Sequence, residues 1–253
     1  MSSPKSILLD WAPSAHGEDL ARLAQSVADA FDAVVDVLYV GPASRMAQAH
    51  AEFGTIAAGL PRLRWNDVRD DPTECFVRRA LYADLTIIGQ QDESAGGDPT
   101  RPADLIPSVI VGSGRPTLII PADCPQPHAP GSRILVGWKP TREAARAVSA
   151  ALPWLQRAKE VHVVNWDPGN ADPPSGLSSL THYLRQHGVE PVKHYRYGDF
   201  PDLGADLSGL ACSLDADLVV MGCYGHARIR EWILGGTSRT MLADSRIPLL
   251  MVH

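Results

Sequence analysis

The feature that most constrains the fold of this chain is an internal repeat. Residues 7–14 align with residues 134–141 at an offset of 127, with a tryptophan and a proline in register. Residues 83–89 align with residues 216–222 at an offset of 133, and both segments begin with Ala-Asp-Leu and end with glycine. Because the offset changes so little over most of the chain, we expect two copies of one domain that differ by small loop changes.

The proline-rich stretch 121–131 separates the two copies. It contains four prolines, which are incompatible with a helix or a central strand. We therefore predict a first domain at 1–126, a linker at 127–132 and a second domain at 133–253. Each copy has a length that is ordinary for a domain with its own core.

Strand and helix patterns alternate along the second copy. The predicted strands are 133–137, 161–166, 192–197, 217–221 and 248–252. The predicted helices are 141–157, 178–187, 201–214 and 236–244, and Gly188 is expected to end the second of them in a left-handed conformation. This alternation predicts an α/β fold, namely two tandem, doubly wound, parallel five-stranded sheets with helices on both faces.

The composition excludes several classes of protein. The chain is 45% hydrophobic and 21% charged, and it has no apolar run long enough to span a bilayer. We see no secretory signal and four cysteines without metal-site spacing, so we expect a cytoplasmic protein without a metal or a membrane partner. A net charge of -6 argues against a nucleic-acid partner.

A glycine-rich segment follows the predicted strand 217–221. Gly222, Gly225 and Gly235 lie in a stretch that leads into the predicted helix 236–244. Backbone amides without side chains around them, together with the amino end of a helix, can bind phosphate oxygens. Lys/Arg and Asp/Glu are nearly balanced in residues 132–253, at 13 and 12, whereas residues 1–131 carry 10 and 17. An anionic ligand is therefore expected in the second copy.

Ligands of doubly wound sheets lie beyond the carboxyl ends of the strands, where the strand order reverses. We expect that point between the first and fourth strands of the second copy, where the loop at Trp138 and Lys139 meets the glycine segment. The predicted nucleotide-binding residues are Gly222, Gly225, His226, Arg228, Gly235, Gly236, Thr237, Ser238, Trp138 and Lys139. Packing is the default explanation for Trp11 and Trp138, and stacking on adenine is the alternative for Trp138.

These residues resemble the universal stress protein family in its tandem form, over essentially the whole chain. Gly222, Gly225 and Gly235 match the family's G-x2-G-x9-G spacing, but Gly236 stands where a Ser or Thr follows, and Thr237 comes one place late. The resemblance implies an adenine nucleotide alpha hydrolase-like fold and binding of ATP with Mg. It also implies an acidic residue after the first strand, where this chain has Lys139. An ammonium only donates hydrogen bonds, so Lys139 is expected to reach a phosphate or to remain a solvated loop residue.

The first copy lacks the glycine pattern. Asp92 and Ala103 stand where the second copy has Gly225 and Gly235. Because carboxylates repel phosphate, we predict no nucleotide in this copy. The family resemblance implies that residues 117–120 pair with residues 249–252, which would make the chain an intramolecular pseudo-dimer and leave a homodimer as a further expected association.

Signs of catalysis are sparse. His226 has no nucleophile elbow, paired carboxylates or metal-binding histidines beside it in sequence, so no catalytic residue is predicted. The favoured function is a stress-response module that binds ATP or a related nucleotide and changes its association with a protein partner. The alternatives are a nucleotide-independent interaction protein and, by family analogy alone, a slow ATP hydrolase.

Overall fold

The structure is a computed structural model that describes residues 3–39, 42–66, 72–90, 102, 104–124, 128–167, 175–198, 200–223 and 236–253. Contacts divide these residues into two units, Ser3–Ala129 and Pro130–His253. The two α/β units that the internal repeat predicted are therefore present. The predicted linker at 127–132 falls partly outside the described residues and stays a prediction.

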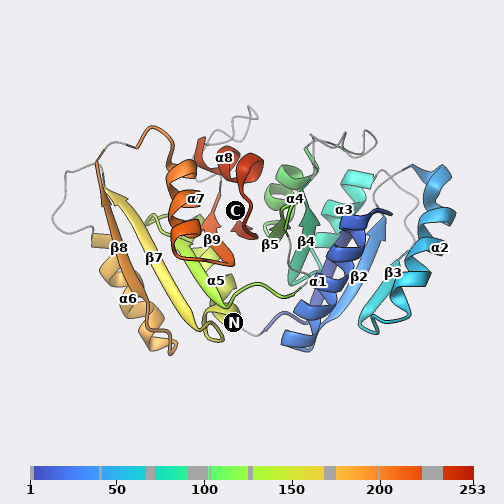
Figure 1. The fold of residues 1–253 in the computed structure, drawn as a ribbon, viewed down its shortest axis with the longest axis horizontal. Coiled ribbons are helices and arrows are strands. Elements are labelled where there is room, and N and C mark those ends of the chain that lie inside the picture. Colours follow the sequence, from blue (N-terminus) through green and yellow to red (C-terminus); the bar gives the residue numbers. More distant parts are fainter. Residues whose placement is uncertain are drawn as a thin grey trace. The chain divides into compact units, whose positions relative to one another are not determined.

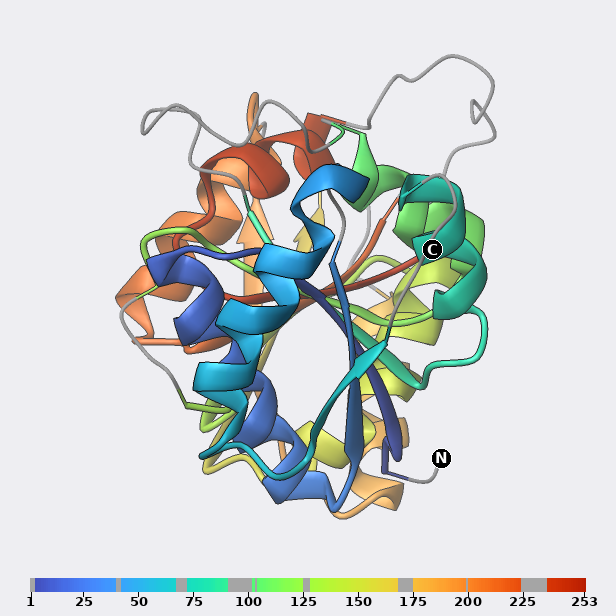
Figure 2. The same cartoon turned by 90° about the vertical axis from the view of Figure 1, so that its right-hand side faces the viewer.

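The first unit is a parallel sheet with the order β3-β2-β1-β4-β5. Helices α1 and α2 lie on one face of this sheet, and α3 and α4 lie on the other (Figure 1, Figure 2). The elements of this unit are β1 (Ser6–Trp11), α1 (Ala15–Phe31), β2 (Val34–Tyr39), a 3-10 turn (Ala43–Arg45), α2 (Met46–Ala57), β3 (Leu63–Asn66), α3 (Pro72–Ala80), β4 (Leu85–Gly89), α4 (Leu105–Ser113) and β5 (Thr117–Ile120).

The second unit repeats this arrangement with the order β10-β9-β6-β7-β8. Helices α5 and α6 cover one face of the sheet, and α7 and α8 cover the other (Figure 1). Its elements are β6 (Arg133–Gly137), α5 (Arg142–Leu155), β7 (Glu160–Asp167), α6 (Ser175–Gln186), β8 (Val192–Tyr197), α7 (Leu203–Ser213), β9 (Leu218–Gly222), α8 (Gly236–Asp244) and β10 (Leu249–Val252). The predicted doubly wound α/β fold is confirmed.

The repeated Ala-Asp-Leu motif has the same structural role in both units. The carboxylate of Asp84 accepts hydrogen bonds from the backbone N–H groups of Lys5 and Ser6, at 2.9 and 3.1 Å. The carboxylate of Asp217 accepts from the N–H groups of Ser132 and Arg133, at 2.9 and 2.8 Å. In each unit one aspartate before an inner strand therefore holds the start of the neighbouring first strand, where backbone donors would otherwise lack partners.

Apolar strands form the core of each unit. All the residues of β4, β5 and β10 are buried, as a sheet covered on both faces requires. Helix ends follow local signals: the side chain of Thr141 caps α5 by accepting from the N–H of Ala144, and Gly188, just past α6, has a φ of 76°. Helix α6 begins earlier than predicted, at Ser175, and the other elements of this unit agree with the prediction within a few residues.

Within the described residues, no helix combines the length and apolar character needed to cross a membrane.

Strands β5 and β10 each take the end position in the strand order of their own unit. Their pairing into a pseudo-dimer remains a prediction.

Candidate functional site

The strand order of the second unit reverses at β6. This strand pairs with β7 on one side and with β9 on the other, and all three run parallel. The helices that follow β6 and β9, α5 and α8, lie on opposite faces (Figure 1). A crevice beyond the carboxyl ends of β6 and β9 is the usual ligand position of such a sheet. The reversal point is therefore where the sequence placed it.

Gly222 forms the end of β9 and lies against the start of α5. A Cβ atom built on it would overlap the amide nitrogen of Ala144 and lie 2.5 Å from the carbonyl carbon of Glu143. A side chain at position 222 would therefore push α5 away from the sheet. This close packing explains why glycine stands here, and the predicted contact of Gly222 with a phosphate stays a prediction.

Glu143 is a buried carboxylate in the first turn of α5 and was not among the predicted site residues. Its exposed fraction is 2%, and it forms an ion pair with the guanidinium of Arg142. Burial by itself raises the pKa of Glu143. The Arg142 side chain, the backbone amide of Glu143 and the Thr141 hydroxyl outweigh that effect and hold the pKa below its ordinary value. An ionised carboxylate is thus built into the edge of the crevice.

The position of Glu143 also affects Cys223, which follows β9. The thiol of Cys223 is buried, with an exposed fraction of 2%. Burial first, and the negative charge of Glu143 second, raise the pKa of Cys223 far above its usual range. Cys223 is therefore a packed side chain with an unreactive thiol.

The amino end of α8 is the other described part of the crevice. The helix begins at Gly236, which is exposed, and a Cβ built on Gly236 would meet no heavy atom within 4 Å. Thr237 is half-buried, whereas Ser238 has an exposed fraction of 5%. The first-turn N–H groups of a helix have no acceptor within the helix, so this end is suited to an anion.

The predicted site residues divide into two groups. Trp138, Lys139, Gly222, Gly236, Thr237 and Ser238 lie in described parts of the second unit at the ends or starts of β6, β9 and α8. Gly225, His226, Arg228 and Gly235 lie outside the described residues. Lys139 is exposed, two residues after the end of β6.

The two matching tryptophans differ in their surroundings. Trp11 in the first unit has an exposed fraction of 1%, donates its Nε1–H to the carbonyl of Gly17 at 2.9 Å, and packs edge-on against Phe53. This residue is part of the core, as its default interpretation predicted. Trp138 is half-buried, and its Nε1 is buried without a hydrogen-bond partner among the described residues. A buried donor of this kind is uncommon and marks Trp138 as different from its repeat partner.

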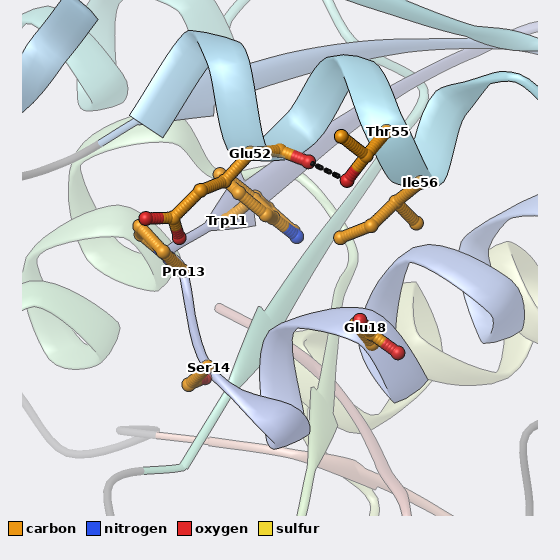
Figure 3. A pocket seen from close by; sticks show the side chains of 7 residues that line it. All are labelled: Trp11, Pro13, Ser14, Glu18, Glu52, Thr55 and Ile56. Atoms are coloured by element: carbon orange, nitrogen blue, oxygen red, sulfur yellow. Dashed lines mark hydrogen bonds between the residues drawn. The ribbon is translucent and has the colours of Figure 1, made fainter. Parts of the chain in front are cut away.

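The first unit contains a cavity of about 280 Å³ at the corresponding strand end. It lies between the loop after β1, the first turn of α1 and helix α2 (Figure 3). The lining residues are Trp11, Pro13, Ser14, Glu18, Glu52, Thr55 and Ile56. Two carboxylates and no basic side chain line it, so it disfavours a phosphate. Asp92 and Ala103, on which the sequence prediction for this unit rested, lie outside the described residues, and that prediction stays a prediction.

In the parts of the chain that the structure describes, no three His, Cys, Asp or Glu side chains are grouped so that they could hold a metal ion.

Comparisons with known proteins agree with this architecture. A universal stress protein from Archaeoglobus fulgidus is 16% identical and superposes with a TM-score of 0.71, over 99% of this chain and 96% of that one. A protein of unknown function from Pseudomonas aeruginosa is also 16% identical, with a TM-score of 0.68 over 99% of this chain and 92% of that one. Comparison with curated protein sequences gives no match.

A third solved structure, the universal stress protein from A. fulgidus in complex with dAMP, is 23% identical over 48% of this chain and 97% of its own, with a TM-score of 0.38. Residues 132–253 of this chain match the model of the universal stress protein family. This match places the second unit, residues 132–253, in the universal stress protein family, and the whole chain shares the fold of a solved universal stress protein.

Proposed function

We propose that this chain is a nucleotide-responsive stress protein whose second unit binds ATP or a related nucleotide in the crevice beyond β6 and β9. The observation that carries the proposal is the open amino end of α8 at the strand reversal point. Gly236 is exposed there, and a Cβ built on it would meet no heavy atom within 4 Å. A phosphate at this end would receive hydrogen bonds from first-turn N–H groups.

The residues around α8 fit a phosphate group. Thr237 offers a half-buried hydroxyl, whereas Ser238 is too buried to serve as a ligand donor without rearrangement. The helix dipole adds only about 0.3–1 kcal/mol, so several N–H bonds must act together. Lys139 is exposed after β6 and supplies a mobile positive charge for the same phosphates. The predicted contributions of Gly225, His226, Arg228 and Gly235 belong to this proposal as well.

The nucleoside part of the ligand needs a hydrogen-bond acceptor that Lys139 cannot provide. Glu143 is the carboxylate nearest in sequence to that position, four residues later and at the same end of the sheet. Its bonds with Arg142 and its own backbone engage it in the structure. Glu143 would therefore have to exchange Arg142 for a ribose hydroxyl, which makes the nucleoside end of the proposed site weaker than the phosphate end.

Native mass spectrometry of freshly purified protein tests the proposal, because it reports bound ligand and subunit number in one spectrum. The expected result is a mass increment of an adenine nucleotide, or its appearance when ATP and Mg are added. Gly225→Asp places a carboxylate in the glycine segment and should remove the increment. A wild-type spectrum without any increment at millimolar ATP would reject this function. The proposed homodimer and the cytoplasmic location would be judged separately, by subunit count and by fractionation.

The buried charge of Glu143 favours a second function. Because an ionised carboxylate at the edge of the crevice repels an incoming phosphate, the second unit would serve as a nucleotide-independent interaction module. Protein purified without nucleotide, together with a partner whose binding is unchanged by ATP, would support it. Phosphate release from ATP above the rate in buffer would instead support the slow hydrolase that family analogy suggests.

A further inference from the structure

Two histidines face each other on the neighbouring strands β7 and β8. The Nδ1 atom of His162 lies 3.0 Å from the Nε2 atom of His194, and the register places His194 opposite Val164. The centres of the two rings are 5.2 Å apart. A centre distance this much larger than the nitrogen distance means that the nitrogens face each other almost head-on. This is the geometry of one hydrogen bond between the two strands.

A single proton occupies that bond. In a neutral imidazole one nitrogen donates and the other accepts, so either ring can supply the proton as long as the facing nitrogen is unprotonated. When both rings are protonated, two N–H groups point at each other and the bond becomes a repulsive contact between two positive charges. A metal ion would need the two lone pairs to converge on a point beside the line between the nitrogens, and the head-on geometry does not provide this.

The pair belongs to a network of charged side chains. Oε2 of Glu160 lies 3.4 Å from Nε2 of His162 and accepts a hydrogen bond from Nε of Arg133 at 2.9 Å. This contact orients the His162 ring from its far side. The titratable and charged groups around the pair are Glu160 on β7, Arg133 on β6, Arg196 on β8, Asp206 on α7 and Asp215 after α7.

These surroundings resist a second proton. His162 has an exposed fraction of 7%, and His194 is half-buried. Burial lowers the pKa of His194 below its ordinary value, and the positive charges of His162 and Arg196 lower it further. The carboxylate of Asp206 lies 3.9 Å from Arg196 and accepts a hydrogen bond from the indole N–H of Trp166 at 2.7 Å, so groups other than the two histidines engage it.

Strand β8 depends on this contact more than an inner strand would. It takes the end position in the strand order of its unit, and β7 is the strand with which it pairs. Val192 and Tyr197, at its two ends, have exposed fractions of 51% and 60%. Little apolar burial therefore holds β8 in place, and a repulsive contact in its middle has a large relative effect.

We propose that His162 and His194 form a proton-sensing contact, which fastens β8 to β7 while the rings share one proton and loosens β8 when both rings are protonated. A fall in pH from neutral would then loosen β8 and open the second unit locally. The ligand of this site is the proton itself, and its action does not depend on nucleotide binding.

Amide hydrogen exchange of residues 192–197 in the full-length protein tests the proposal at about pH 7.5 and about pH 5.5, either side of the ordinary histidine pKa of about 6.5. After correction for the intrinsic exchange rate, the protection of β8 should fall by up to about tenfold at the lower pH. The lower pH lies about one unit below the ordinary histidine pKa, and one pH unit changes the ratio of protonated to neutral histidine tenfold. Protection of the inner strand β6 should change much less. Equal protection of β8 at both pH values would overturn the proposal.

Variants separate this effect from general acid sensitivity. His194→Gln keeps an amide that can donate to His162 but cannot be protonated, so its β8 protection should no longer depend on pH. His182→Gln, at an exposed position on α6, should behave like the wild type. An NMR titration gives a second readout: the midpoint of His194 should rise in His162→Gln, because one cause of its lowered pKa is removed. A His194→Gln variant that keeps the wild-type pH response, or an unmoved midpoint, would contradict the proposal.

Discussion

Gly222 at the end of β9 lies directly against Glu143 in the first turn of α5, so close that a Cβ on Gly222 would be 2.5 Å from the Glu143 carbonyl carbon. The contact joins the two elements that border the candidate crevice. Both backbones are fixed there by a helix and by strand pairing, so neither can move without disturbing its hydrogen bonds.

Gly222→Ala should therefore destabilise the second unit by about 1–3 kcal/mol, the usual cost of overpacking a closely packed site. Urea denaturation measures this difference. Gly209→Ala is the matched control, since Gly209 is exposed on α7 with free space around it, and alanine there should stabilise by about 0.5–1 kcal/mol. Equal stabilities of Gly222→Ala and the wild type would refute the packing explanation.

The buried charge of Glu143 predicts a dependence of stability on pH. Its folded-state pKa lies below its ordinary value of 4.5, so the native state binds fewer protons than the unfolded state in the interval between the two values. The stabilisation is complete above pH 4.5 and is lost as the pH falls through that interval. Glu143→Gln should flatten this part of the stability curve, which denaturation at a series of pH values would measure. A variant curve parallel to that of the wild type would show that Glu143 does not contribute.

The matching tryptophans should respond differently to the same substitution. Trp11→Phe removes the hydrogen bond from the indole to the Gly17 carbonyl and leaves a gap at a fully buried site, at a cost of about 1–3 kcal/mol. Trp138→Phe removes a buried N–H that has no partner among the described residues, so its cost should be smaller. Thermal or urea unfolding of the two variants compares them directly. A larger loss for Trp138→Phe would show that its indole N–H has an important partner.

Much of the fold could be predicted from the sequence because the evidence for it is local and repeated. The Ala-Asp-Leu motif recurs since Asp84 and Asp217 perform the same backbone anchoring in both units. Continuous apolar strands such as β9 required a sheet covered on both faces. The start of α6 could not be placed well, because it follows a Pro/Gly/Ser segment without a clear capping residue.

The site was less predictable. Glycine spacing pointed to the end of β9 and the start of α8, and the topology places both where the strand order reverses. The burial of Glu143 depends on how α5 packs against Gly222, a contact between residues 79 positions apart that no local pattern encodes. One available signal was the Thr141 cap followed by an acidic first turn. The His162–His194 contact likewise depends on the register of β7 and β8.

Lys139 provides a test of which part of a nucleotide lies near β6. If it contacts phosphate, Lys139→Ala should weaken ATP binding by about 0.2–1 kcal/mol, as expected for an exposed charge pair, and the loss should shrink at high salt. Adenosine binding should not change, because adenosine has no phosphate. Titration calorimetry with both ligands measures these effects. An equal loss for ATP and adenosine would instead place the lysine at the nucleoside.

Titration of ATP with Mg into the full-length protein and two charge variants tests the central claim, that the open end of α8 receives an anion. Gly236→Asp adds a carboxylate at the exposed start of α8, where there is space for it, and a first-turn acid should not harm the helix. Gly209→Asp adds the same charge at an exposed position on α7 of the same unit. We expect saturable binding by the wild type and by Gly209→Asp, and at least about tenfold weaker binding by Gly236→Asp, since about 1.4 kcal/mol of repulsion suffices for that factor. A flat wild-type titration, or equal binding by all three proteins, would contradict it.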